Sequence, residues 1–291
     1  DEYNHKRRPS LKNRRAIVGE PMTELDSILA GLAWSDTLTF GSGVDAITGQ
    51  GMSSAVEPFG PIPREIKTSY ENYRFVQDES AFDQEIGASA GGSYNIEGVT
   101  ISAKAEYLTK LQYSDVSISL VAKYDSRYDG YDLAESYSLT PIAQEFIKDP
   151  PQFRRMYGDY FVAGGMRASR FVAVYLCKAS TKDDMDQFKT SFEGDFPLVF
   201  SAKGSASFLQ KAEEYHIQIS VDVFMTGYEG VPPSGPWTPE AVLKALEWFK
   251  EHEQGIYFEA LLYHYSIIDP TYPRTILIAP EIFIDLSLLY L

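Results

Sequence analysis

The chain has 291 residues, of which 44% are hydrophobic and 14% aromatic, and its formal net charge is −15. This hydrophobic content is enough for a sizeable core, so the composition excludes a globally disordered chain. The negative charge repels nucleic-acid phosphates, and we therefore expect no nucleic-acid binding by the folded part.

Basic residues are concentrated in the first fifteen positions. They are Lys6, Arg7, Arg8, Lys12, Arg14 and Arg15. We expect residues 1–22 to form a flexible basic arm, which is able to contact anionic lipid. No internal repeat or low-complexity linker follows this arm, which predicts a single domain over residues 23–291.

Apolar spacing, glycine and proline predict the elements of the N-terminal part. Residues 23–33 have the spacing of a short helix, and residues 37–40 read as a strand that enters a glycine-rich loop. A turn region is expected next, because proline cannot continue a helix or a central strand. The prolines that mark this region are Pro58, Pro61 and Pro63.

Residues 82–103 alternate, at every second position, between apolar or small side chains and mostly polar ones. The first face carries Phe82, Ile86, Ala88, Ala90, Tyr94 and Ile96. The phase of the alternation changes near Gly98, where a bulge forms easily. The pattern fits a half-buried strand of a soluble domain, a closely packed helix of small residues, or a membrane β-strand.

Two helices have the same start signal, a threonine followed by a proline. Thr140-Pro141 and Thr238-Pro239 each supply a capping hydroxyl and a proline at the first helical position. Pro150-Pro151 predicts the end of the first of these helices. No run of residues approaches the roughly 18 apolar positions of a helix that spans a membrane.

Alternating residues predict strands at 116–122, 217–225 and 275–279. The apolar run around Cys177 predicts a buried strand with a packed thiol. Strands mixed with separate helices, without regular β-α-β alternation, favour an α+β fold with an antiparallel sheet.

Residues 195–208 repeat the alternation. The apolar face of this second segment carries Phe196, Leu198, Phe200, Ala202, Ala206 and Phe208. The flanking residues 183–192 and 208–215 are predicted to be helical. A membrane β-strand needs about 9–11 residues, and both alternating segments are long enough.

Signals for catalysis or metal binding are weak in this sequence. Residues 41–46 fit a dinucleotide G-x-G-x-x-A motif, but a poor helix former follows, and a plain glycine loop is expected. Residues 125–136 resemble a calcium loop with Arg127 at a ligand position, which favours a solvated turn. The four histidines have no metal-ligand spacing. We expect no cofactor, no metal and no enzymatic activity; an enzyme with a dispersed active site is the alternative.

Residues 151–171, PQFRRMYGDYFVAGGMRASRF, resemble the signature region of the membrane-attack-complex/perforin (MACPF) family. The family pattern is aromatic-Gly-Thr/Ser-His-aromatic, followed by Gly-Gly. Tyr157, Gly158 and Phe161 match this pattern. Asp159 stands where Thr or Ser is usual, and Tyr160 stands where His is usual.

The rest of the chain is also similar in its order of pieces. An early G-x-G-x-D loop ending at Asp45 precedes the first alternating segment, the signature, the second segment and a return strand. Ala168-Ser169 stands at the usual Gly-Gly, with Gly164-Gly165 nearby. By the resemblance, Gly158, Gly164 and Gly165 are hinge residues that let the sheet open.

The resemblance implies an α+β fold in which a bent, twisted four-stranded antiparallel sheet is flanked by two helical clusters. In that family both clusters refold into β-hairpins during oligomeric pore formation. The corresponding positions here are residues 80–115 and 183–215. The alternating segments 82–103 and 195–208 lie within these two ranges.

The function implied by the resemblance is that of a pore-forming or membrane-perturbing protein, such as a cytolytic toxin. Its partners would be a lipid membrane and further copies of the chain, with a targeting protein as an additional partner. The alternative is a non-lytic protein of the same fold that serves in binding, adhesion or assembly. Secretion and membrane association are favoured over cytoplasmic storage.

Overall fold

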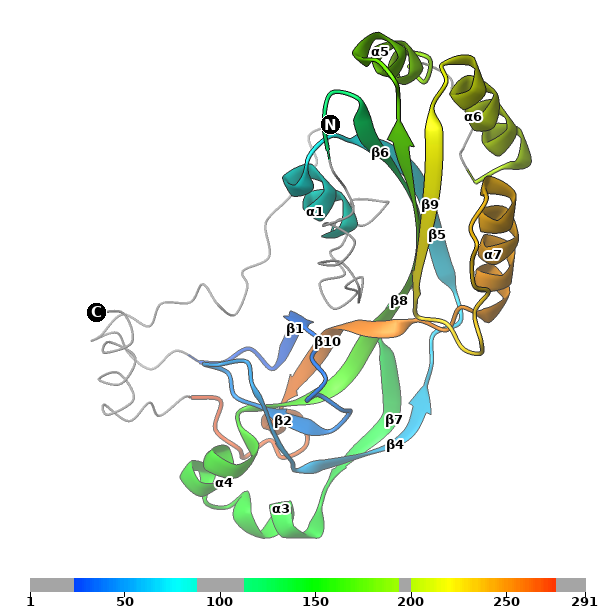
Figure 1. Ribbon diagram of the computed structural model, residues 1–291. Helices are drawn as coiled ribbons and strands as arrows, with labels where there is room; N and C mark the ends of the chain where they lie inside the picture. The colour runs from blue at the N-terminus through cyan, green and yellow to red at the C-terminus, as the bar shows by residue number, and fades with distance from the viewer. Residues whose placement is uncertain (1–23, 88–112, 194–199, 276–291) are drawn as a thin grey trace, which may run out of the picture. The chain divides into compact units, whose positions relative to one another are not determined.

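The computed structural model describes residues 24–87, 113–193 and 200–275 (Figure 1). The strands of these residues are β1 (Ile28–Ala33), β2 (Ser42–Val44), β3 (Gly51–Ser54), β4 (Val56–Ile62), β5 (Lys67–Val76), β6 (Ser117–Tyr128), β7 (Asp132–Leu139), β8 (Tyr160–Lys178), β9 (Gln218–Thr226) and β10 (Ile256–His264). The helices are α1 (Glu79–Gly87), α3 (Pro141–Phe146), α4 (Pro150–Tyr157), α5 (Lys182–Thr190), α6 (Ala202–Glu214), α7 (Pro239–His252) and the short 3-10 helix η2 (Tyr265–Ile267). None of these helices of the described residues is long and apolar enough to cross a membrane.

The chain divides into two compact units. Unit 1 takes its described residues from the ranges 1–63, 131–165 and 259–291, and unit 2 from the ranges 64–130 and 166–258. The expectation of a single domain over residues 23–291 stays a prediction.

Unit 2 is built on four antiparallel strands in the order β5-β6-β8-β9. The two central strands, β6 and β8, are buried along most of their length, as expected for strands covered on both faces. Cys177 lies in β8 with a buried thiol, which confirms the packed thiol expected from the sequence. Burial raises the pKa of this thiol to about 12.

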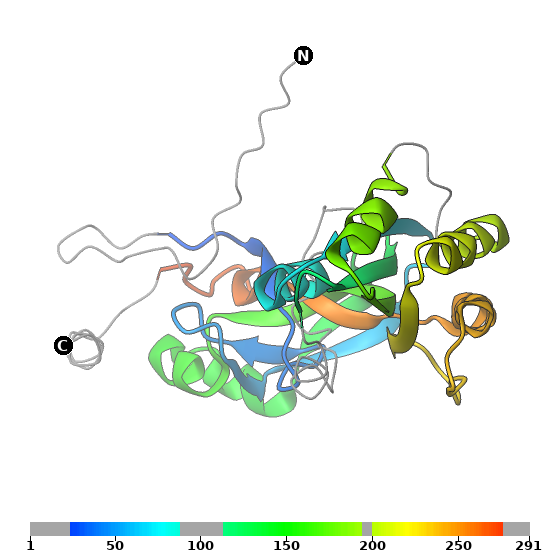
Figure 2. The same ribbon diagram turned by 45° about the horizontal axis from the view of Figure 1, so that its top comes forward.

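The two faces of this four-stranded part carry different helices (Figure 1). On one face, α5, α6 and α7 pack on alternate residues of β6 and β8, among them Leu120 and Tyr175. On the other face, α1 packs on the intervening residues, among them Val121 and Val174. Successive side chains of a strand point to opposite faces, so α1 and the other three helices are on opposite sides. Figure 2 shows α6 and α7 side by side on their face.

Unit 1 contains the remaining strands together with α3, α4 and η2. Within it, β1 pairs with β10, β4 with β7, and β2 with both β3 and β8. Helices α3 and α4 cover an apolar cluster that includes Phe153 and Tyr157 of α4, Phe161 of β8 and Tyr265 of η2. This cluster surrounds the signature residues of the sequence.

The fold is mixed, with helices and a large antiparallel sheet, and the expected four-stranded sheet is wrong. The ten strands of the described residues are hydrogen bonded into one sheet. The additional strands come from segments that the sequence pattern assigned to a helix, a loop or a turn, or to which it assigned no element, such as β5 and β10. They pair through backbone groups, which leave little trace in side-chain periodicity.

The helix expected at residues 23–33 is also wrong, because residues 28–33 form β1. The ladder between β1 and β10 shifts register between Leu29 and Leu32, and Gly31 lies in the shift with a φ of 90°. This bulge adds one residue to the strand, so that Leu29 and Leu32 both lie half-buried in the same cluster. The two leucines are therefore three positions apart on one face of the strand, which is also the spacing of apolar residues on one face of a helix.

Several boundaries between residues 37 and 63 differ from expectation. The strand expected at 37–40 begins only at Ser42, whose hydroxyl accepts the backbone N–H of Thr39 at 2.9 Å and closes a turn. Pro58 and Pro61 lie inside β4 instead of a turn. β4 pairs with β7 and no other strand of the described residues, so the missing proline N–H groups cost the ladder little.

Several other expectations are confirmed. Residues 116–122 and 217–225 contribute to β6 and β9. Thr140 and Thr238 cap α3 and α7. Pro150 opens a further helix, α4, soon after α3 ends. The strand predicted at 275–279 lies largely outside the described residues.

Candidate functional site

Helix α4 and the start of β8 place the sequence signature in unit 1. Asp149 caps α4, where its carboxylate accepts the backbone N–H of Gln152 at 3.3 Å. The helix ends at Gly158, whose φ of 74° is in the left-handed region. Glycine adopts this region readily because no Cβ opposes it. Gly158 therefore directs the chain from α4 into β8.

Two glycines let β2 lie directly against this turn. Gly158 forms a parallel bridge with Val44, and the N–H of Asp159 donates to the Val44 carbonyl at 2.9 Å. A Cβ on Gly158 would lie 2.4 Å from the Val44 carbonyl oxygen. A Cβ on Gly43 would lie 2.0 Å from the Tyr157 carbonyl oxygen. The G-x-G-x-D loop and the signature are therefore in backbone contact, and both glycines are required for it.

Asp159 joins the same two segments through its side chain. Its carboxylate accepts hydrogen bonds from Arg154 Nε at 2.7 Å, from Arg154 Nη2 at 3.2 Å and from the Ala46 N–H at 2.8 Å. Arg154 also lies 3.6 Å from the Asp45 carboxylate. Burial raises the pKa of Asp159, and the Arg154 guanidinium opposes this shift. The acid at the unusual signature position thus fixes the G-x-G-x-D loop.

Tyr160 occupies the position where histidine is usual in the family pattern. It is fully buried, and its hydroxyl donates to the Asp26 carbonyl at 2.7 Å. Its ring meets the imidazole of His264 edge-on, with 5.4 Å between the ring centroids. Burial, with a smaller contribution from Arg274, lowers the pKa of His264 to about 4.

Phe161 belongs to an aromatic cluster on the other side of β8. Phe153 and Tyr265 meet edge-on at a centroid distance of 4.7 Å, and Phe161 lies 5.6 Å from Tyr265. The buried hydroxyl of Tyr265 donates to the Tyr157 carbonyl at 2.8 Å. Burial raises the pKa of Tyr265 far above its usual value. This cluster holds α4 against β8.

The two remaining glycines of the signature, Gly164 and Gly165, lie where β8 pairs with β7. Their register partners are Leu133 and Asp132. A Cβ on Gly164 would lie 2.7 Å from the Asp132 carbonyl oxygen, so this glycine also permits a close approach of two strands. Their expected role as hinge residues stays a prediction.

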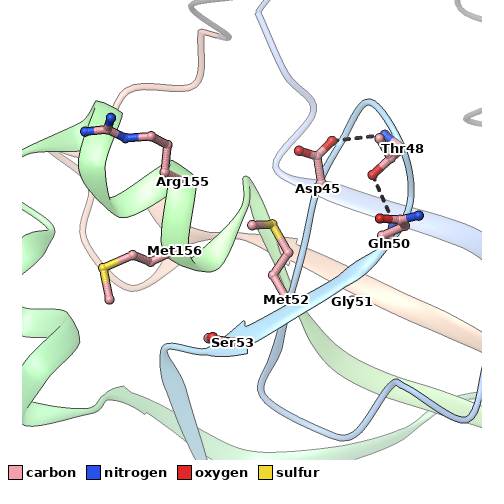
Figure 3. Close-up of a pocket in the computed structure, with 8 residues that line it drawn as sticks. All are labelled: Asp45, Thr48, Gln50, Gly51, Met52, Ser53, Arg155 and Met156. Carbon is pink, nitrogen blue, oxygen red and sulfur yellow. Dashed lines mark hydrogen bonds between the residues drawn. The ribbon is translucent and has the colours of Figure 1, made fainter. Parts of the chain in front are cut away.

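A pocket of about 640 Å³ lies between the turn that joins β2 to β3 and helix α4 (Figure 3). Its lining residues are Asp45, Thr48, Gln50, Gly51, Met52, Ser53, Arg155 and Met156. The Asp45 carboxylate accepts the N–H groups of Ile47 and Thr48 at 2.7 and 2.9 Å. Asp45, the acidic residue of this pocket, therefore stabilises the turn between β2 and β3.

The arrangement is suited to holding backbone segments together. The side chains of Asp45, Arg154 and Asp159 form ion pairs with one another, and the two carboxylates also accept backbone N–H groups. In residues 24–87, 113–193 and 200–275, no group of three or more His, Cys, Asp or Glu side chains is arranged to hold a metal ion. We refer to the contact of residues 41–46 with residues 154–161 as the signature clamp.

The first group of candidate membrane-inserting residues lies partly on α1. Phe82 and Ile86 are buried against Val121, Val172 and Val174 of unit 2. Ala88, Ala90, Tyr94 and Ile96 lie outside the described residues.

The second group lies partly on α6. Phe208 is buried in the large apolar cluster, and Phe200 is half-buried against the same cluster. Ala202 and Ala206 are exposed on the surface of the helix. Phe196 and Leu198 lie outside the described residues. Residues 202–208 thus form part of a helix, one of the alternatives that their spacing left open.

Sequence reasoning missed several residues of this site and of its surroundings. Arg154 had a usable signal, because it lies five positions before the unusual acid Asp159. Lys123, in unit 2, had another, because it follows directly on the alternating strand expected at residues 116–122. Tyr265 and His264 had no such signal, because their contacts with Tyr157 and Tyr160 join residues far apart in the sequence, and local spacing does not predict such contacts.

No family model matches this sequence, and no curated protein matches it. Among solved structures, stonustoxin is similar at a TM-score of 0.43 and 12% identity, over 83% of this chain and 32% of that one. GNIP1Aa from Chromobacterium piscinae is similar at a TM-score of 0.31 and 12% identity, over 90% of this chain and 56% of that one. Astrotactin-2, a conserved vertebrate-specific and perforin-like membrane protein, is similar at a TM-score of 0.28 and 12% identity, over 81% of this chain and 39% of that one. The chain thus spans about a third to just over half the length of these proteins.

Proposed function

We propose that this chain is a pore-forming or membrane-perturbing protein of the MACPF type. Copies of the chain assemble on a lipid membrane, and residues 80–115 and 183–215 of each copy convert into amphipathic β-hairpins that enter the bilayer. The proposal involves no cofactor and no covalent chemistry. Targeting depends on the lipid or on a partner protein.

The observation that carries the proposal is a double periodicity in α6. As a helix, it buries Gly204, Ser205, Phe208 and Ala212, which share one face at helical spacing. The same stretch also alternates, so that Ala202 and Ala206 would join Phe208 on one face of a ribbon. The helix leaves both alanines exposed and makes no use of this second pattern. A ribbon in a bilayer would use it.

The signature clamp supports the same proposal from another part of the chain. The resemblance to the MACPF family rests on a G-x-G-x-D loop and a signature that are far apart in the sequence. Gly43 lies against the Tyr157 carbonyl and Gly158 lies against the Val44 carbonyl, each at a place where a Cβ would collide with the carbonyl oxygen. Two motifs that meet in this way are better explained as one structural unit of a fold than as separate loops.

Assembly must precede or accompany insertion for a physical reason. Every backbone N–H and C=O of a strand in lipid needs a hydrogen-bond partner, and a hairpin alone leaves both of its edges unpaired. Neighbouring copies supply those partners. Lone copies should therefore bind to the membrane without causing leakage.

The test compares two lysine substitutions on the exposed surface of α6. Ala206→Lys and Leu209→Lys both replace exposed residues of the helix. Position 206 lies on the apolar face of the ribbon, whereas position 209, one residue beyond the alternating segment 195–208, lies on the opposite face when the strand continues. A lysine that faces lipid near the bilayer centre costs about 2–4 kcal/mol. Dye release from liposomes should therefore fall at least tenfold for Ala206→Lys and change little for Leu209→Lys.

Equal leakage from the two variants, at equal folded fraction, would reject the ribbon. A second candidate function, a non-lytic binding or assembly protein of the same fold, is favoured by the full burial of Phe82 and Phe208, because their release is costly. Absence of leakage and of ring particles on liposomes of varied composition, with a stable monomer, would decide for this alternative.

A further inference from the structure

The two segments assigned above to membrane insertion are held to unit 2 by different chemistry. Helices α5 and α6 are held by apolar contacts, in which Phe188, Phe192 and Phe208 lie within 6 Å of one another by ring centroid. Helix α1 is held by apolar contacts and, in addition, by a buried group of four charges. These are Glu85 of α1, Lys123 and Asp125 of β6, and Arg170 of β8.

The two buried cations contact the last turn of α1. The Lys123 ammonium lies 2.8 Å from Glu85 Oε1 and also donates to the Glu85 backbone carbonyl. Arg170 Nη1 donates to the Ile86 carbonyl. The final carbonyls of a helix lack partners within the helix and carry the negative end of its dipole, so a cation is favoured there. Both cations thus complete the end of α1.

The two cations differ in what they keep if α1 leaves. Asp125 and Arg170 are register partners on adjacent strands, and the Arg170 guanidinium binds both Asp125 oxygens at 2.7 and 2.9 Å. This pair belongs to the sheet and persists without the helix. The register partners of Lys123 are Asn72 and Val172, so its ion-pair contact with Glu85 depends on α1.

The solvent side of Glu85 is also occupied by a cation. Arg74 of β5 lies 3.5 Å from Glu85 Oε2, with its own side chain mostly exposed. Lys123, by contrast, is fully buried. Burial lowers the pKa of Lys123, and Glu85 opposes this shift. Losing Glu85 would therefore remove the carboxylate that contacts the buried Lys123 ammonium, whereas the Arg74 guanidinium would remain hydrated.

We infer that the Lys123–Glu85 pair is a latch that holds α1 on the four-stranded part of unit 2, and that its opening is a separate step from the release of α5 and α6. The latch is a property of the water-soluble protein. Its consequence for insertion rests on the function proposed above. The second segment has an apolar attachment and needs no such step.

The test measures hydrogen exchange of the α1 amides in the soluble protein, without any membrane. Lys123→Met keeps the length and apolar stem of the side chain and removes its charge, which leaves Glu85 buried and poorly paired. Exchange within α1 should accelerate on the order of 100-fold, with a much smaller change in α7. The matched control is Lys244→Met, which removes the lysine of an exposed ion pair with Glu240 on α7. Exchange in α1 as slow as in this control overturns the latch.

A double-mutant cycle tests whether the two residues act as one unit. Glu85→Gln should also accelerate exchange in α1, and Glu79→Gln, at an exposed position of the same helix, is its control. In the double variant the acceleration should be at least about tenfold less than the product of the two single effects, because no buried charge is left alone. Effects that multiply as independent factors overturn the latch. If Lys123→Met does not fold, the comparison of Glu85→Gln with Glu79→Gln decides in the same way.

Leakage is recorded separately, so that the two proposals can fail separately. If the chain forms pores, Lys123→Met should shorten the lag before dye release. Accelerated exchange in α1 without leakage from any variant would retain the latch and reject pore formation. Dye release with unchanged exchange in α1 of Lys123→Met would retain pore formation and reject the latch.

Discussion

Asp159 is buried at the start of β8, and a buried carboxylate is stable only when other groups satisfy its oxygens. Arg154 supplies two hydrogen bonds and the Ala46 N–H supplies a third. Because Asp159 is buried, water does not replace the hydrogen bonds that Arg154 and the Ala46 N–H donate to its carboxylate. The signature position therefore uses an ion pair where the family pattern has a hydroxyl.

Asp159→Asn should destabilise the protein by about 2–4 kcal/mol, because it leaves Arg154 without its bidentate partner. Urea unfolding measures the loss. The matched control is Asp186→Asn on α5, where the acid is 51% exposed and its partner Lys189 is 27% exposed, and a loss below about 0.5 kcal/mol is expected. If both variants lose the same amount, the clamp does not depend on this ion pair.

His264 predicts a dependence of stability on pH. Its pKa is about 4 in the folded protein and 6.5 ordinarily. Between these values the unfolded chain binds a proton that the folded chain excludes, so stability falls as the pH falls from about 7 to about 4. The loss amounts to about 3 kcal/mol.

His264→Asn should remove this part of the pH dependence, since asparagine does not titrate and its Oδ1 can still accept the Ser266 N–H that His264 Nδ1 accepts at 3.1 Å. The comparison of the two curves isolates His264. Asp159, whose raised pKa acts in the opposite direction, is present in both proteins. Parallel curves between pH 7 and 4 would contradict the assignment.

At the scale of elements, helix starts were the most predictable feature. A Thr-Pro pair specifies a cap by chemistry that is local to three or four residues. The Thr238 hydroxyl accepts the Ala241 N–H at 3.1 Å, and Val242, Ala245, Leu246 and Phe249 are buried as their spacing predicts. Nothing distant is needed for such a prediction.

Thr238→Ala should therefore destabilise the protein by about 1 kcal/mol, whereas Thr238→Ser, which keeps the hydroxyl, should lose only a few tenths. The midpoint of urea unfolding distinguishes them. An equal loss in the serine and alanine variants would mean that the methyl group, and not the cap, matters at this position.

Strands were predictable where their side chains alternate clearly along the sequence, and unpredictable elsewhere. β6 and β9 follow their alternation, but β1 contains a bulge at Gly31 that gives its leucines helical spacing. In α6, residues 202–208 satisfy two periods at once, and only packing with Phe188 and Tyr175 selects the helix. Local pattern cannot choose between two periods that both fit.

At the scale of the whole molecule, the candidate site was predictable in its parts and not in its assembly. Tyr157, Gly158 and Phe161 were recognisable from the signature, and Gly43 and Asp45 from the early loop. Their contact through the Val44–Gly158 bridge was not, because it joins residues that share no local period. The same holds for the ten-stranded sheet, whose additional strands are specified by distant partners.

The separation between Ala46 and Asp159 also has a consequence for biosynthesis. These residues are 113 positions apart, and neither half of the clamp is complete without the other. At about 5–20 residues per second, a ribosome needs roughly 6–23 s to deliver the second half after the first. During that interval the nascent segment around Gly43 can pair with β3 but lacks its contacts with residues 157–161, so one edge of β2 stays open to association with other chains.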